Sequence, residues 1–77
     1  MFNVTVLDIQ RVSVIFQERV SNVILPGKEG ELSVLDFHQS IIACLKHGTI
    51  RIDNNPVDIK SGIARMQGEE LIVFVER

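Results

Sequence analysis

Residues 25–40 read LPGKEGELSVLDFHQS. This stretch decides the fold because it predicts a rigid turn between two short strands. Pro26 fixes its own φ and is expected to end the first strand, while Gly27 and Gly30 supply backbone angles that other residues avoid. The charged residues of the turn are expected to face water: Lys28, Glu29 and Glu31. The stretch is not a phosphate-binding loop, because its lysine comes early and a strand, not a helix, follows it.

Alternation of apolar and polar residues continues through the chain on both sides of this turn. Phe2, Val4 and Val6 alternate with polar residues, which is typical of a half-buried strand. The same spacing predicts a second strand with its inward residues at Val12, Val14 and Phe16. Further short apolar runs occupy residues 23–25, 31–35, 49–53, 57–60, 63–67 and 71–76.

Turn signals separate these runs, among them Asn54-Asn55, which favours a two-residue hairpin loop because asparagine tolerates positive φ. Residues 38–45, HQSIIACL, admit a strand or a short helix, and β-branched Ile41 and Ile42 favour the strand. The sequence therefore predicts one all-β domain over residues 1–77, a small two-layer β-sandwich of about nine or ten short strands.

Several apolar residues fall on the opposite face from the main apolar set of their strands: Ile15, Ile24, Ile42, Ile72 and Phe74. A two-layer sandwich hides one face of each strand and leaves the other face to water. Either edge twist hides these side chains locally, or they form an exposed apolar patch of the kind that marks a docking site. We favour a docking surface.

Composition excludes several classes of protein. The formal net charge is −2, and the eight basic residues are scattered among ten acidic ones, which argues against nucleic-acid binding and against a polybasic membrane anchor. No apolar stretch is long enough to span a bilayer, and the first residues do not resemble a signal peptide. One cysteine in 77 residues argues for a reducing compartment.

His38, Cys44 and His47 are the candidates for a metal site, with Asp36 or Asp53 needed to complete the ligands. Zinc sites draw on paired short spacings, and the sequence offers no second pair. We therefore expect two surface histidines, a buried and unreactive Cys44, and no metal.

Catalysis has no better support. None of the candidate serines has a nucleophile elbow around it: Ser33, Ser40 and Ser61. The paired carboxylates, Glu29 with Glu31 and Glu69 with Glu70, adjoin glycines in turn-like segments, where such groups are normally solvated. A chain of this size also has little room for a pocket that excludes water. We expect neither enzymatic activity nor a cofactor.

Residues 20–52, VSNVILPGKEGELSVLDFHQSIIACLKHGTIRI, resemble the N-terminal β-sandwich of the epsilon subunit of rotary F-type ATP synthases, called delta in mitochondria. The shared features are Pro26-Gly27, Glu29-Gly30-Glu31, Ser33-Val34-Leu35, His38, the apolar run 41–45 and His47-Gly48. Residues 61–76, SGIARMQGEELIVFVE, resemble the closing strands of the same domain.

The chain departs from the family pattern at three places. Around the histidine, Asp36-Phe37-His38-Gln39-Ser40 replaces Pro-Gly-His-Ala-Pro. Lys46-His47-Gly48 stands where Lys-Pro-Gly is usual, and Ile63 replaces the second glycine of Ser-Gly-Gly. These changes affect turn rigidity and docking detail and leave the strand pattern intact.

The resemblance implies a non-catalytic rotor component of a proton- or sodium-driven ATP synthase, located between the gamma subunit and the membrane c-ring. It places the turn against the c-ring, with Glu31 as the charged contact, through Gly27, Lys28, Glu29, Gly30 and Glu31. It places a second face against gamma: His38, Ser40, Ile41, Ile42 and Ala43. The alternative is a generic β-sandwich adaptor that binds other proteins or itself.

The resemblance also implies a peripheral position on the cytoplasmic face of the inner (plasma) membrane, without direct insertion. Family members usually continue into a helical C-terminal region that inhibits ATP hydrolysis and, in some bacteria, binds ATP. Residues 1–77 stop after the last expected strand, as in a naturally short member or an N-terminal fragment. We therefore expect residues 1–77 neither to inhibit ATP hydrolysis nor to bind ATP.

Overall fold

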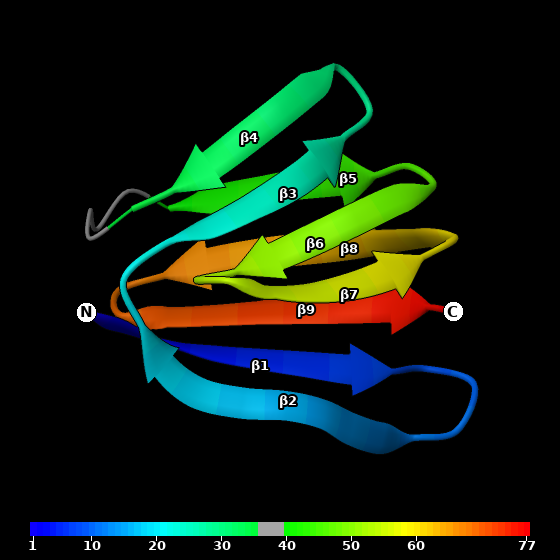
Figure 1. Cartoon of the computed structure of the whole chain (residues 1–77), viewed down its shortest axis with the longest axis horizontal. Helices are drawn as coiled ribbons and strands as arrows, with labels where there is room; N and C mark the ends of the chain where they lie inside the picture. The colour runs from blue at the N-terminus through cyan, green and yellow to red at the C-terminus, as the bar shows by residue number, and fades with distance from the viewer. Residues whose placement is uncertain (36–39) are drawn as a thin grey trace.

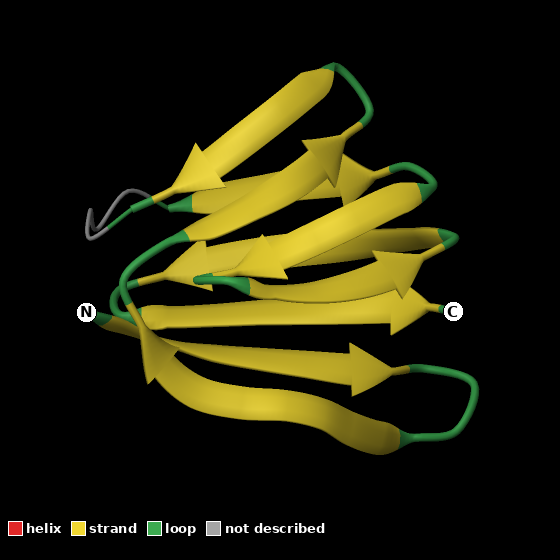
Figure 2. Ribbon diagram, in the orientation of Figure 1, coloured by secondary structure: helices red, strands yellow, loops and turns green. Residues whose placement is uncertain are grey.

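The computed structural model describes residues 1–35 and 40–77, and its regular elements there are all β-strands (Figure 2). The strands are β1 (Phe2–Asp8), β2 (Ser13–Val20), β3 (Val23–Gly27), β4 (Gly30–Val34), β5 (Ile41–Leu45), β6 (Gly48–Ile52), β7 (Asn55–Ile59), β8 (Ser61–Gln67) and β9 (Glu70–Glu76). The predicted all-β class is confirmed. The strand interpretation of the apolar run that begins at Ile41 is confirmed as well.

The strands form one hydrogen-bonded sheet that curls into two layers. One layer has the order β2-β1-β9-β8-β5, and the other contains β3, β6 and β7, with β4 paired to β3. In Figure 1, β3 and β6 lie in front of β5 and β8. All neighbours are antiparallel except β1 and β9, which pair in parallel. The predicted two-layer β-sandwich is confirmed.

Side chains from both layers fill the space between them, as the alternation predicts. Phe2, Val4 and Val6 of β1 are completely buried. They pack with the inward residues of the other strands: Val20, Val23, Leu25, Val34, Leu45, Ile50, Ile52, Val57, Ile59, Ala64, Met66, Leu71, Val73 and Val75. Burying each large apolar side chain of this kind contributes about 1.5–3 kcal/mol to folding.

Strand β2 does not follow the predicted alternation. Val12, expected to point inward, lies in the β1–β2 turn with φ of 50° and is 89% exposed. The register with β1 shifts from Val6 opposite Phe16 to Leu7 opposite Val14, so Ile15 is an extra residue in a β-bulge. The bulge places Ile15 and Phe16 both partly against the core and leaves Val14 exposed.

The β6–β7 turn lies one residue earlier than the sequence suggested, because Ile52 pairs with Asn55 and leaves Asp53-Asn54 as the loop. Asp53 adopts a positive φ of 53°. Its carboxylate oxygen Oδ1 accepts hydrogen bonds from the amides of Ser21 (3.2 Å) and Asn22 (3.1 Å). Its own amide donates to the carbonyl of Asn22 at 2.8 Å, so this turn fixes the connection between β2 and β3.

The two layers are joined at the end of β3, where Gly27 pairs with Leu45 of β5. The amide of Lys28 donates to the carbonyl of Cys44 (3.0 Å), and the amide of Lys46 donates to the carbonyl of Pro26 (2.9 Å). The strand thus continues through Pro26, which the sequence analysis expected to end it.

Gly27 is required at this joint by close approach of the backbone. A Cβ at Gly27 would lie 2.6 Å from the carbonyl oxygen of Gly30, a contact that real Cβ atoms do not make. Of the two glycines expected to need positive φ, Gly30 has it (131°) and Gly27 does not. The expectation for Gly27 was therefore right about the residue and wrong about the cause.

Replacing Gly27 with alanine should therefore destabilise the domain. We expect Gly27→Ala to cost about 1–3 kcal/mol, because the backbone of the turn must move to admit a methyl group. Thermal unfolding measures this loss, at about 4–8 °C per kcal/mol for a domain of this size. Ser33→Ala, at an exposed position on β4, is the control and should leave the melting temperature unchanged. Equal melting of both variants would remove the steric explanation.

Candidate partner-binding surface

The charged turn stands beside β5, so the two surfaces that the sequence analysis predicted separately are neighbours. Residues 27–32 and 41–44 line the same open hollow, whose volume is about 650 Å³. Ser40 lines a smaller adjoining hollow at the start of β5, together with Ile41, Ile42 and Arg65. His38, which was also predicted for this face, lies outside the described residues.

The turn offers its charges to solvent. Lys28, Glu29 and Glu31 are all exposed, and Glu31 sits opposite Pro26 in the β3–β4 ladder. Within residues 1–35 and 40–77, the Glu31 carboxylate has no ion-pair partner. A charged group at such a place is free to pair with a group on another molecule.

An apolar row crosses the outer face of the β5-β8-β9-β1-β2 layer, on the side away from the core. Cys44 pairs with Ile63, and Ile63 pairs with Phe74. Phe74 in turn pairs with Leu7, which pairs with Val14. Cross-strand neighbours of this kind are in side-chain contact range, so these five residues form one continuous strip, called here the outer apolar row.

Most of the outer apolar row is exposed to solvent. The exposed fractions are 52% for Val14, 50% for Ile63 and 40% for Phe74. Near its end a shallow hollow of about 270 Å³ brings Cys44, Ile63 and Phe74 together with Ile9 and with Lys28 of the turn. The apolar row and the charged turn are therefore parts of one surface.

The excess of outward apolar residues predicted from the sequence is confirmed in part. Ile42 and Phe74 are exposed, with Ile42 at 75%, whereas Ile15, Ile24 and Ile72 are half-buried. Ile63 and Leu7 also belong to the outward set, and so does Val14, which was expected to point inward. The signal for them is the pairing register, which aligns three strands at once and cannot be read from any one strand.

The expectation of a buried Cys44 was wrong, because its side chain is exposed. The apolar run 41–45 alternates between the core and the outer face, and Cys44 falls on the outer face next to Ile63. Ile42 was expected on the outward face, and Cys44 lies two residues further along the same strand, so it shares that face. His47 is exposed, as expected.

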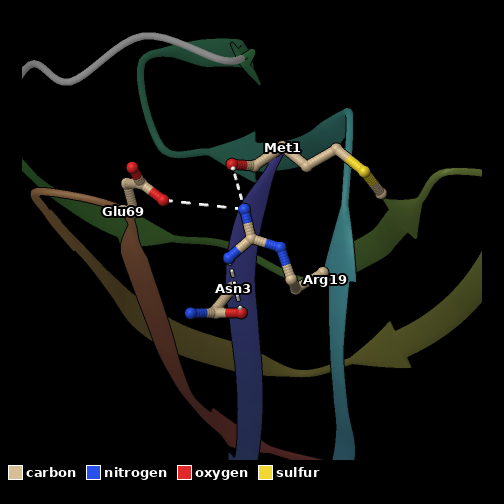
Figure 3. Close-up of polar contacts among 4 residues, drawn as sticks. All are labelled: Met1, Asn3, Arg19 and Glu69. Carbon is tan, nitrogen blue, oxygen red and sulfur yellow. Dashed lines mark hydrogen bonds and ion pairs between the residues drawn. The ribbon is translucent and has the colours of Figure 1, made fainter.

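The opposite end of the same outer face is polar, and its groups satisfy one another (Figure 3). The Arg19 guanidinium donates to the carbonyl of Met1 (3.0 Å) and to the side-chain oxygen of Asn3 (3.4 Å), and it lies 3.6 Å from the Glu69 carboxylate. Exposed pairs of this kind contribute little to stability, about 0–1 kcal/mol. The part of this face that leaves apolar side chains in contact with water is the outer apolar row.

Other kinds of site receive no support from the described residues. Within them, no three His, Cys, Asp or Glu side chains come together as metal ligands. The same part of the chain contains no helix of the length and apolar character that crossing a bilayer requires. What the geometry presents is an apolar strip beside a charged turn, which suits contact with another macromolecule.

The fold and surface together define a small β-sandwich domain with an exposed apolar row on its outer face. Residues 1–77 match the family model for the β-sandwich domain of the ATP synthase delta/epsilon chain. The chain belongs to this family, as the resemblance in its turn and closing strands indicated.

Relatives of known identity agree with this assignment. The ATP synthase epsilon chain of Campylobacter concisus is 37% identical over 67 residues, covering 80% of this chain and 52% of the relative. That of Sulfurimonas denitrificans is 35% identical over 68 residues, covering 82% of this chain and 52% of the relative. The chain thus spans about half the length of these relatives.

A solved structure shares the fold. A chain in the cryo-EM structure of the central stalk and c-ring of Tetrahymena thermophila mitochondrial ATP synthase matches with a TM-score of 0.77 at 13% identity. The match covers 97% of this chain and 63% of that one. At this identity the likeness shows the fold alone.

The exposure of Cys44 has a direct chemical consequence. In the folded protein a small thiol reagent should modify Cys44 completely and without a lag, because no unfolding step is needed to reach the sulfur. We expect a rate within about tenfold of that in denaturant, since accessibility is no longer limiting. Ellman's reagent measures both rates. A reaction limited by the rate of global unfolding would show that the thiol is buried after all.

Proposed function

We propose that this domain is a rotor component of an F-type ATP synthase that couples the c-ring to the gamma subunit. The observation that carries the proposal is the outer apolar row beside the charged turn, on a domain of the delta/epsilon family. Central-stalk and c-ring surroundings are stated for the Tetrahymena neighbour, and we extend them to this chain.

The mechanism proposed is mechanical. The sandwich acts as a stiff body that contacts gamma through apolar side chains and the c-ring through the turn 27–31. Apolar contacts at the centre of an interface carry most of the binding energy, whereas charges at the rim mainly set orientation and association rate. Lys28 lines the same hollow as Cys44 and Phe74, so the two proposed contact regions adjoin on one small domain.

The remaining features of the proposal follow from this position in the complex. The domain is peripheral to the membrane, on the cytoplasmic face, and reaches it through the c-ring. It binds no cofactor and performs no catalysis itself. Inhibition of ATP hydrolysis and ATP binding form no part of the function proposed for residues 1–77.

Retention of the chain by its cognate gamma subunit tests the proposal. We expect Ile63→Glu to weaken retention at least about tenfold, because a carboxylate would be buried unpaired in an apolar interface. Ser33→Glu adds the same carboxylate at an exposed position of β4, so it is the control and should bind like the wild-type chain. Absence of wild-type retention at micromolar concentrations would count against the whole proposal.

Light scattering on the isolated chain separates the proposal from the alternative of a self-associating adaptor. We expect a monomer, since the apolar row is reserved for a different subunit. A tight homodimer that Ile63→Glu dissociates would favour the adaptor.

The charged contact with the c-ring is tested at Glu31. Glu31→Lys should leave folding stability within about 0.5 kcal/mol of wild type, because the side chain is exposed and away from structural features. ATP-driven ion pumping in vesicles containing the whole complex should fall, while binding to gamma is retained. Glu18→Lys on β2 provides the control. A large loss of melting temperature would instead identify Glu31 as a structural residue of the turn.

A further inference from the structure

Free sheet edges attract other strands, and two of the edges in this sandwich are visibly protected. The edge strand β2 contains a bulge at Ile15 and charged residues at Glu18 and Arg19. The edge strand β7 carries Pro56, which has no amide hydrogen to donate. Bulges, charges and proline are the usual devices that prevent pairing with another chain.

The second edge of β5 lacks all of these devices. One edge of β5 pairs with β8 along its whole length, from Ile41 to Leu45. The other edge pairs with β3 at Leu45 and nowhere else in the described part of the chain. The strand reads IIACL, without charge, proline or bulge. An apolar edge of this kind is open to pairing with another chain.

The hydrogen bonds at the joint identify the backbone groups that are unused. The carbonyl of Cys44 and the amide of Lys46 both point toward β3, as their bonds to Lys28 and Pro26 show. Because the backbone groups of alternate residues point to the same edge of a strand, the amide and carbonyl of Ile42 point to that edge as well. Nothing in the described residues pairs with them.

The space beside this edge suits one extended segment. The hollow of about 650 Å³ lies along residues 41–44 and is bounded on its other side by residues 27–32. Because the turn and β5 both line this hollow, an incoming chain must fit between them, which a single extended strand does with the least bulk. The smaller hollow at Ser40 and Ile41 continues the opening along the strand.

We infer that an extended segment of the partner subunit adds a strand to β5 through the backbone of Ile42. The inference rests on the proposed function, because it describes how the subunit proposed above is held. Ile41 and Ala43 pair with buried Met66 and Ala64 and so lie on the core face, while Ile42 is exposed on the outer face. The added strand therefore has apolar neighbours on both of its faces. We expect the partner segment itself to be apolar over about three consecutive positions.

Proline at position 42 tests the inference, because it removes the amide that faces the open edge and leaves the β5–β8 hydrogen bonds in place. We expect Ile42→Pro to bind the cognate gamma subunit about tenfold more weakly than Ile42→Ala, which loses the side chain and keeps the amide. Hydrogen exchange on the wild-type complex provides a second measurement. The amide of Ile42 should exchange at least about tenfold more slowly in the complex than in the free chain.

Each outcome decides a different question. If wild-type chain does not bind gamma, the proposed function fails and the strand addition fails with it. If it binds, but Ile42→Pro and Ile42→Ala bind equally and the Ile42 amide exchanges unchanged, strand addition is overturned and the proposed function stands. If Ile42→Pro fails to fold, the exchange rate of the wild-type amide decides alone. A homodimer of the isolated chain that Ile42→Pro dissociates would assign the edge to a second copy and overturn the inference.

Discussion

The bridge between Gly27 and Leu45 is the constraint on which the rest of the structure depends. Two hydrogen bonds there join β3 to β5 and so connect the two layers of the sandwich. At the same residue the β3–β4 hairpin closes, and the carbonyl of Gly30 approaches Gly27 so closely that no side chain fits between them. The same two hydrogen bonds hold the charged turn beside β5, and they pair β5 with β3 at Leu45, the last residue of β5. The hollow between the turn and β5 adjoins this bridge, and so does the stretch of β5 that has no strand partner at Ile42.

Size explains why so much apolar surface is left outside. A domain of 77 residues buries only roughly 60% of the surface of its unfolded chain, so two thin layers cannot cover both of their faces. The inward positions are filled with large apolar residues, and the core is complete without the outer apolar row. Val14, Ile63 and Phe74 therefore contribute less to folding than their hydrophobicity suggests. A continuous exposed strip of this kind is typical of a surface that contacts another molecule, and on an isolated domain it is an aggregation liability.

The sequence was sufficient to predict most of the strands and part of the outward apolar set. The reasons for success and failure differ from strand to strand. Strict alternation made β1 and β9 readable, and the outward position of Phe74 came from it directly. Alternation failed in β2, because a bulge inserts one residue and reverses the faces beyond it, and no residue type announces a bulge. In β5 all five residues are apolar, so no polar residue marks the outward face, and Cys44 was taken as buried although it shares that face with Ile42. The outer apolar row depends on register between strands distant in sequence, which no single run of residues contains.

Strand addition would give this surface a property that side-chain contacts alone do not have. Displacing a paired strand by one residue moves all of its side chains to the opposite face, so register resists sliding along the strand direction. Apolar contact between flat faces has no comparable barrier, because it is not directional. A partner strand beside Ile42 would also adjoin Cys44, the first residue of the outer apolar row, and Lys28 of the turn. Backbone pairing would then fix the position, the apolar row would supply affinity, and the charged turn would remain free for a second partner. This division of roles suits the proposed coupling of the c-ring to gamma, because a body that transmits torque must not slip against its neighbours.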